Sequence, residues 1–222
     1  NGSGWYSAGG GSCINSSPTM LNLKISGNTS NANGGGINFS YSNSSLVNVA
    51  ITGNTGDVGG GINCNNASPS LTNVTIADNT ASQDGSGISL FASNPILTNV
   101  TITNNTASQY GGGIYCGYST INLVNCILWE NFPQDIYNGS SGTVNIDYSN
   151  IQDGWYGEGN INANPLFCNP DSGNYTLAEN SPCVGTGENG ANMGAYGIGC
   201  GYIYIPQTIN VPTDYPTIQL GL

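Results

Sequence analysis

The chain has 222 residues, of which only 6% are charged, and its formal net charge of -11 leaves Lys24 as the single basic residue. Nucleic acids and anionic membranes both attract clustered Lys and Arg, so this composition excludes both as partners. The absence of histidine excludes His-based triads and His metal sites.

The N-terminus and the overall composition indicate an exported protein. The chain begins at Asn1 without an initiator Met or a signal peptide, so we expect a processed chain or a piece of a longer one. Low charge, seven cysteines and many small polar residues suit an extracellular or bacterial cell-surface location. No apolar run reaches the length of a membrane helix, so we expect no membrane insertion.

Residues 1–160 are built from a repeat of 25 or 26 residues. Each copy has an alternating apolar segment, then Asn-Thr, a variable loop and a glycine-rich element such as Gly-Gly-Gly-Ile. The copies are "MLNLKISGNT" from Met20, "LVNVAITGNT" from Leu46, "LTNVTIADNT" from Leu71, "LTNVTITNNT" from Leu97 and "LVNCILWENF" from Leu123. Such a period is typical of solenoids, and the alternation is that of strands. We therefore expect an all-β, right-handed parallel β-helix with one repeat per coil.

Asparagine recurs in two columns of this repeat. The columns are Asn22, Asn48, Asn73, Asn99 and Asn125, and Asn28, Asn54, Asn79, Asn105 and Asn131. Asn tolerates the left-handed backbone of a sharp corner, and amides stacked in register can donate to one neighbour and accept from the other. We expect two structural ladders, with Asn73 and Asn99 in an inward corner.

The repeat resembles that of the right-handed parallel β-helix proteins of bacterial surfaces. Its glycine and N-x-T elements are similar, more loosely, to the GGAI and FxxN repeats of polymorphic outer-membrane autotransporters. Enzymes of the fold that the resemblance implies work with carboxylate clusters plus Arg, Lys or His. Lys24 is the only base and occupies a strand position, and we assign it to the solvated surface.

Residues 161–202 form an expected C-terminal cap segment. The stretch from Asn164 to Cys200 resembles the terminal segment of secreted bacterial β-helices, in which NPLF, a GxYxL strand, SPC and an NMGAY element follow one another. A solenoid exposes unpaired strand edges and apolar side chains at its last coil, so we expect this segment to cover that end.

Residues 203–222 follow the cap segment as a tail. The stretch "INVPTDYPTIQLGL" resembles the opening of another β-helix. One interpretation is the start of the next unit of a tandem protein. The other is an assembly tail that docks on a neighbouring subunit, through Ile209, Val211, Tyr215 and Ile218.

The seven cysteines divide between the repeats and the cap segment. Cys64 and Cys116 lie two coils apart, too far for a disulfide at about 4.8 Å per coil, and are expected to be buried small residues. In the cap segment a disulfide among Cys168, Cys183 and Cys200 is plausible.

Three groups of residues are candidates for ligand binding, and each has a structural alternative. Carboxylates beside aromatic rings suit a sugar-binding surface, or else a solvated rim; these are Trp129, Trp155, Tyr156, Asp153 and Glu158. Asp57 and Asp84 could flank a calcium ion. Outward threonines at positions 72, 75, 98 and 101 would form an ice-binding face if they were exposed.

These patterns favour a non-catalytic structural or adhesive module at the cell surface. Its most specific form is a filament subunit that self-associates end to end through its tail. The alternative class is a carbohydrate-binding or carbohydrate-active domain with cell-surface glycans as partners, and ice binding is a third possibility. We expect no catalytic residues, no metal site and no cofactor.

Overall fold

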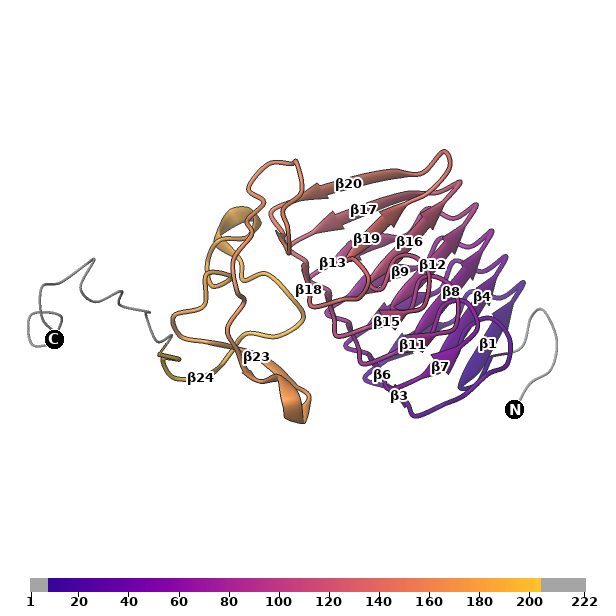
Figure 1. Ribbon diagram of the computed structural model, residues 1–222, viewed down its shortest axis with the longest axis horizontal. Coiled ribbons are helices and arrows are strands. Elements are labelled where there is room, and N and C mark those ends of the chain that lie inside the picture. Colours follow the sequence, from indigo (N-terminus) through magenta and orange to yellow (C-terminus); the bar gives the residue numbers. More distant parts are fainter. Residues whose placement is uncertain (1–7, 205–222) are drawn as a thin grey trace, which may run out of the picture.

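The computed structural model describes residues 8–204 and is an all-β solenoid of stacked parallel strands (Figure 1). Each coil gives one strand to each of three six-stranded sheets, A, B and C. Sheet A contains β1 (Gly11–Ile14), β4 (Ile37–Ser40), β8 (Ile62–Asn65), β12 (Ile88–Phe91), β16 (Ile114–Gly117) and β19 (Ile136–Asn138). Sheet B contains β2 (Thr19–Leu21), β5 (Ser45–Val47), β9 (Ser70–Thr72), β13 (Ile96–Thr98), β17 (Thr120–Val124) and β20 (Thr143–Asp147). Sheet C contains β3 (Lys24–Ser26), β6 (Ala50–Thr52), β10 (Thr75–Ala77), β14 (Thr101–Thr103), β18 (Ile127–Trp129) and β21 (Asn150–Ile151). The expected parallel β-helix is thereby confirmed.

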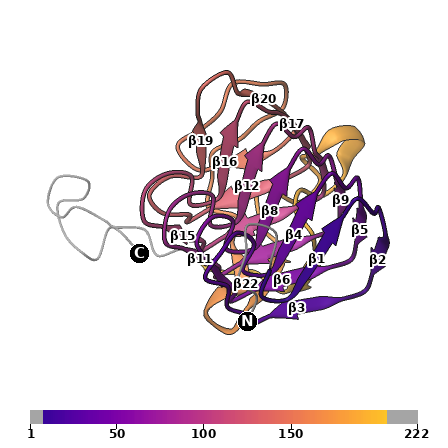
Figure 2. The ribbon, with the colours of Figure 1, turned by 90° about the vertical axis from the view of Figure 1, so that its right-hand side faces the viewer.

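Parallel pairing in register stacks like residues on one another. Ile76 pairs with Ile51 on one side and with Ile102 on the other. All three are fully buried and belong to one core that runs through the solenoid. Removing each such side chain from water contributes about 1.5 to 3 kcal/mol, which a single isolated coil could not gain. Figure 2 shows the strands of sheet A side by side, from β1 to β19.

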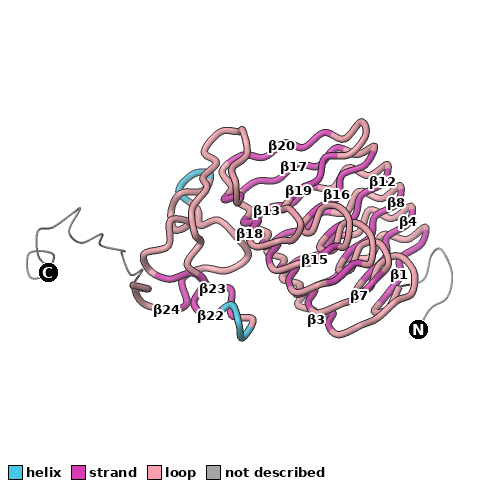
Figure 3. The backbone as a smooth tube through the Cα atoms, in the orientation of Figure 1, coloured by secondary structure: helices cyan, strands magenta, loops and turns pink. Residues whose placement is uncertain are grey.

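The glycine elements allow neighbouring coils to approach closely at one corner. A short sheet D lies at this corner and consists of β7 (Thr55–Gly56), β11 (Thr80–Ala81) and β15 (Thr106–Ala107). A Cβ atom on Gly60 would lie 2.4 Å from the carbonyl oxygen of Thr80. The preceding residue, Gly59, has a φ of 69°, which favours glycine. Figure 3 shows how much of each coil consists of such turns and loops.

The second asparagine column forms a buried ladder. In each step the Nδ2 group donates to Oδ1 of the Asn one coil later, as Asn54 does to Asn79 and Asn79 to Asn105, at 3.0 and 2.9 Å. Asn79 Nδ2 also donates to the carbonyl oxygen of Ile51 at 3.0 Å. The Oδ1 atom of Asn79 accepts a second bond, from the backbone N–H of Asn54. Each inner amide is therefore fully hydrogen-bonded although it is buried, as its desolvation requires.

The first asparagine column forms a ladder on the outside of the solenoid, so the expected inward position of Asn73 and Asn99 is wrong. Their φ angles near 53° mark a left-handed corner, and both side chains are half-exposed. Asn99 donates to Asn73 at 3.1 Å, in the opposite direction to the inner ladder. The next step, in which Asn125 Nδ2 would donate to Asn99 Oδ1, is not formed, and this oxygen has no partner in the described chain. Asn125 Oδ1 accepts the backbone N–H of Glu188, in the C-terminal segment.

The last coil is covered by the chain that directly follows it. Residues 158–161 pair with residues 148–151, through bonds such as Ile151 N–H to the Ile161 carbonyl at 3.0 Å. Trp155 packs against the end of the core. Asn160 Nδ2 donates to the Ile146 carbonyl at 2.8 Å. The end of the solenoid is therefore covered by a loop, by one tryptophan and by the first residues of the expected cap segment, Ile161 and Ala163, whereas the rest of that segment lies elsewhere.

The expected cap segment lies along the side of the solenoid, against the outer face of sheet C (Figure 1). It contains a small sheet E and two short 3-10 helices. These are β22 (Phe167–Asn169), η1 (Pro170–Ser172), β23 (Asn174–Ala178), η2 (Glu188–Gly190) and β24 (Ile198–Cys200). Its apolar residues, such as Leu177 and Met193, form a second core with Ala77 and Ile127, which point outward from sheet C. The segment therefore covers the apolar residues that sheet C turns outward.

Candidate functional site

The aromatic residues expected to share one ligand site are separated in the structure. Trp129 packs against the second core, beside the C-terminal segment, whereas Trp155 packs against the main core. Tyr156 is 100% exposed. Glu158 accepts the hydroxyl of Tyr148 and so holds the loop that covers the last coil. The two tryptophans thus contribute to packing in different places.

The remaining predicted acid, Asp153, lines a cavity of about 290 Å³ with Glu130 and Asp135. Asp135 is only 8% exposed. Its Oδ1 atom accepts the side-chain amide and the backbone N–H of Asn131, at 2.8 and 3.3 Å. Its Oδ2 atom accepts the backbone N–H of Gln152 at 3.2 Å. Burial raises the pKa of Asp135 to about 6, against the lowering effect of these hydrogen bonds.

A carboxyl group with a raised pKa in an acidic cavity has the make-up of a general acid or base. In Asp135, however, both oxygens are occupied by the bonds just described. The residue takes the place that another Asn would have at the end of the inner ladder. We therefore assign Asp135 a structural role, which the sequence did not reveal because it lies four residues after Asn131 and not one repeat.

The two aspartates considered for calcium are engaged with protein donors. Asp57 accepts the Gln83 side-chain amide at 2.7 Å and the Ser82 hydroxyl. Asp84 accepts the backbone N–H of Tyr110 at 3.1 Å. Across residues 8–204, no group of three or more acidic, cysteine or histidine side chains is arranged to hold a metal ion.

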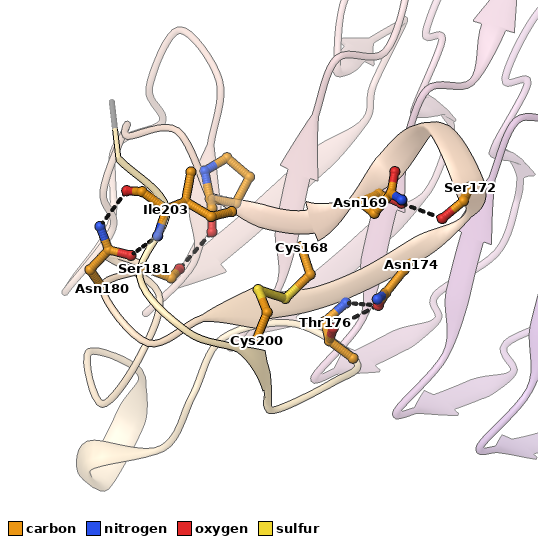
Figure 4. The surroundings of a disulfide bond; sticks show 10 residues. Cys168, Asn169, Ser172, Asn174, Thr176, Asn180, Ser181, Cys200 and Ile203 are labelled. Atoms are coloured by element: carbon orange, nitrogen blue, oxygen red, sulfur yellow. Dashed lines mark hydrogen bonds between the residues drawn. A yellow bond between two sulfur atoms is a disulfide. The ribbon is translucent and has the colours of Figure 1, made fainter. Parts of the chain in front are cut away.

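A disulfide joins Cys168 to Cys200 and ties β22 to β24 within the C-terminal segment (Figure 4). The third cysteine of this segment, Cys183, is buried with a free thiol. Figure 4 also shows Asn180 bound to both backbone polar groups of Ile203, at 2.9 Å each. The free thiols of the repeats are also buried, and burial raises the pKa of Cys126 to about 12. These thiols behave as packing residues.

The threonine columns do not form an exposed face. Thr75 and Thr101 point outward from sheet C, but the C-terminal segment covers them to 2% and 0% exposure. The backbone N–H of Ala195 donates to Thr101 Oγ1 at 3.0 Å. The exposed face of threonines that the ice-binding interpretation requires is therefore not present at these positions.

A shallow cavity of about 290 Å³ remains where the C-terminal segment meets sheet C. Lys24 and Tyr196 line it and are exposed, as expected for Lys24. Tyr175 donates to Asp78 at 2.9 Å across this junction, and burial raises the pKa of the tyrosine. The hydrogen bond fastens β23 to the solenoid, so this cavity is a seam between two packed parts.

The outer face of sheet A carries a strip of aromatic rings that the sequence analysis missed. Tyr115 and Tyr137 are register partners on β16 and β19 and stack with ring centroids 5.6 Å apart. Tyr110 stacks on Tyr137 at 4.4 Å. Phe91 and Tyr118, both more than half exposed, meet edge to face at 5.6 Å. These five residues are called the aromatic strip below.

A signal for the strip was present in the aligned repeats. The outward column that contains Tyr115 holds Asn38, Asn63 and Ser89 in the earlier coils. These three polar residues are buried, whereas Tyr115 and Tyr137 are half-buried, so the last coils replace buried polar residues with partly exposed aromatic ones. These positions lie outside the main core, so the alignment of the copies already carried a signal for the strip.

Comparison of the chain with protein-family models, with curated proteins and with solved structures finds no match. Within residues 8–204 no helix is long and apolar enough to span a membrane. The expected assembly residues Ile209, Val211, Tyr215 and Ile218 lie outside the described residues.

Proposed function

We propose that this chain is a non-catalytic, extracellular structural and adhesive module that works through its rigid shape and its long side faces. The supporting observation is the occupation of its chemically distinctive groups. Asp135 ends a ladder, Trp155 covers a core and the free thiols are buried. The sides of the solenoid remain as regular surfaces from which contacts can be made.

The same proposal includes the finer resemblance noted from the sequence. We place the chain with the secreted bacterial β-helix surface proteins, and residues 161–202 with their terminal segments. The disulfide between Cys168 and Cys200 supports this assignment, since structural disulfides persist in oxidising compartments.

The specific form of the proposal is a subunit that joins its neighbour through residues 203–222. The first coil offers a suitable receptor. Its strands β1, β2 and β3 each have a partner on one side only within the described chain. Its core residues Met20 and Ile25 are only half-buried. A strand edge with apolar side chains behind it is a template for another chain.

Electron microscopy of the purified full chain tests this form of the proposal. We expect threads, and single particles from a chain ending at Tyr204. Ile218→Asp is expected to abolish the threads, whereas Gln219→Asp, whose side chain would point the other way in a strand, is expected to retain them. A full chain that is monomeric in micrographs and in sedimentation at all concentrations would rule out the filament.

A further inference from the structure

We propose that the aromatic strip on sheet A binds a neutral polysaccharide chain. The inference rests on the adhesive part of the proposed function and names its ligand class. It starts from the arrangement of Tyr110, Tyr115 and Tyr137, whose rings are nearly parallel, with interplanar angles of 25° and 17°. Tyr137 stacks with both other rings, so the surface left to a ligand consists of the outer parts of Tyr110 and Tyr115 and of the hydroxyl groups at the ring edges.

Two glycines allow Tyr115 to lie along the sheet instead of standing away from it. A Cβ atom on Gly117 would lie 2.9 Å from Cε1 of the Tyr115 ring. A Cβ atom on Gly139 would lie 3.3 Å from the Tyr115 hydroxyl. Gly117 is also the register partner of Phe91. The two glycines therefore leave the space that the Tyr115 ring fills. Gly117 also lies between this ring and Phe91, and so between the three stacked tyrosines and the pair formed by Phe91 and Tyr118.

The chemistry of the strip matches a sugar better than an apolar protein surface. The outward positions on β12, β16 and β19 are Ser89, Phe91, Tyr115, Gly117 and Tyr137, with no aliphatic side chain among them. A sugar ring has an apolar C–H face, which the negative face of an aromatic ring attracts, and a rim of hydroxyl groups. Tyrosine hydroxyls supply hydrogen bonds to such a rim.

Charge selects a neutral sugar. Burial raises the pKa of Tyr115, and the negative charge of the nearby Asp84 raises it further. The only base of the chain, Lys24, lies on β3 of sheet C. With a net charge of -11 the molecule repels polyanions, which excludes acidic polysaccharides and nucleic acids as ligands.

The dimensions of the strip suit a polymer. It extends over three adjacent strands of sheet A, β12, β16 and β19. Three strands span two steps of about 4.8 Å, close to the length of roughly two sugar rings. A polysaccharide lying across the strands would thus meet rings from successive coils.

Native affinity electrophoresis of the full chain tests the inference, with hydroxyethyl cellulose, xylan, mannan and mixed-linkage β-glucan as neutral probes and polygalacturonate as the acidic one. We expect at least one neutral probe to retard the protein and the acidic one to have no effect. Tyr137→Ala should weaken binding at least tenfold, because Tyr137 stacks on both other tyrosines. Tyr156→Ala, which removes an equally large but isolated exposed ring, should bind as the wild type does.

Gly117→Ala is a second variant that removes no aromatic group. Its methyl group would displace the Tyr115 ring, and we expect several-fold weaker binding with an unchanged circular dichroism spectrum. The inference is wrong if no neutral probe retards the wild type, or if Tyr137→Ala and Gly117→Ala both bind as tightly as Tyr156→Ala. Threads in micrographs without sugar binding would reject the ligand and leave the structural proposal standing.

Discussion

Asparagine serves two different purposes in this molecule, and the difference lies in burial. Asn79 is 1% exposed and its side chain takes part in four hydrogen bonds, two as donor and two as acceptor. Asn73 is half-exposed and takes part in two, with its neighbours in the outer ladder. Water can replace the lost partners of an exposed amide, but a buried amide has no substitute.

Substitution of the two residues by alanine should therefore have unequal effects. We expect Asn79→Ala to lower the free energy of unfolding by about 3 to 5 kcal/mol, since it leaves the buried N–H groups of Asn54 unpaired. Asn73→Ala should cost about 1 to 2 kcal/mol, part of it from placing alanine in a left-handed conformation. Urea denaturation measures both, and equal losses would contradict the distinction between the ladders.

The end of the inner ladder makes stability depend on pH. Burial raises the pKa of Asp135 from 3.8 to about 6 in the folded state, so the folded protein binds the proton more tightly than the unfolded one. The resulting stabilisation is complete below about pH 4 and is lost as the pH rises through 6, by about 2 to 3 kcal/mol. Asp135→Asn should lack this component in urea denaturation between pH 4 and 7.5. If the free energy of unfolding changed with pH equally in the variant and in the wild type, Asp135 would not be the cause of the pH dependence.

At the scale of elements, sheet C is distinguished by the C-terminal segment, which covers its outer face at β10, β14 and β18. Its inward residues belong to the main core, and its outward residues on β10, β14 and β18 contact the C-terminal segment. One consequence is visible in adjacent register partners, Thr75 and Thr101. Thr101 Oγ1 accepts an N–H from Ala195, whereas the buried Thr75 Oγ1 has no partner in the described chain.

Valine, which matches threonine in shape, should have opposite effects at these two positions. Thr75→Val removes an unpaired buried hydroxyl and is expected to stabilise the protein by about 0.5 to 1 kcal/mol. Thr101→Val leaves the Ala195 N–H unpaired and should cost about 1 to 2 kcal/mol. Thermal and urea unfolding of the two variants provide the comparison, and a loss of stability at both positions would contradict the assigned contacts.

At the scale of the whole molecule, the solenoid is a stack in which each coil contacts mainly its neighbours. Contacts between the C-terminal segment and the solenoid involve later coils, at Asp78, Thr101 and Asn125. No described hydrogen bond joins this segment to the first coil, where Lys24 lines the cavity beside it. A complete coil can thus be removed from the N-terminal half without loss of register or of these contacts.

Deletion of Leu23–Asn48 removes one coil of 26 residues and joins Asn22 to Val49. Asn22 then takes the place of Asn48, its partner in the outer ladder, so the register of the following strands is kept. We expect a folded protein with an unchanged β-type circular dichroism spectrum and a modestly lower urea midpoint. Deletion of Leu23–Gly35 alone would bring a strand of sheet A to the position of sheet C and should prevent folding. If the variant without Leu23–Asn48 were as unfolded as this control, the idea that each coil adds its own contribution to stability would be wrong.

The sequence by itself determined the period, the parallel stacking, the burial of the cysteines in the repeats and the existence of both asparagine columns. These features depend on contacts between residues one repeat apart, such as Asn79 and Asn105, and alignment of the copies reveals such contacts directly. Only the tertiary structure decided where the C-terminal segment lies, because its bonds to Asn125, Thr101 and Asp78 span 63, 94 and 97 residues without any periodicity. The side on which each Asn column lies, the role of Asp135 and the stacking of Tyr110 on Tyr137 were likewise decided in three dimensions. They depend on the path of the backbone at corners and loops, where the repeat is weakest.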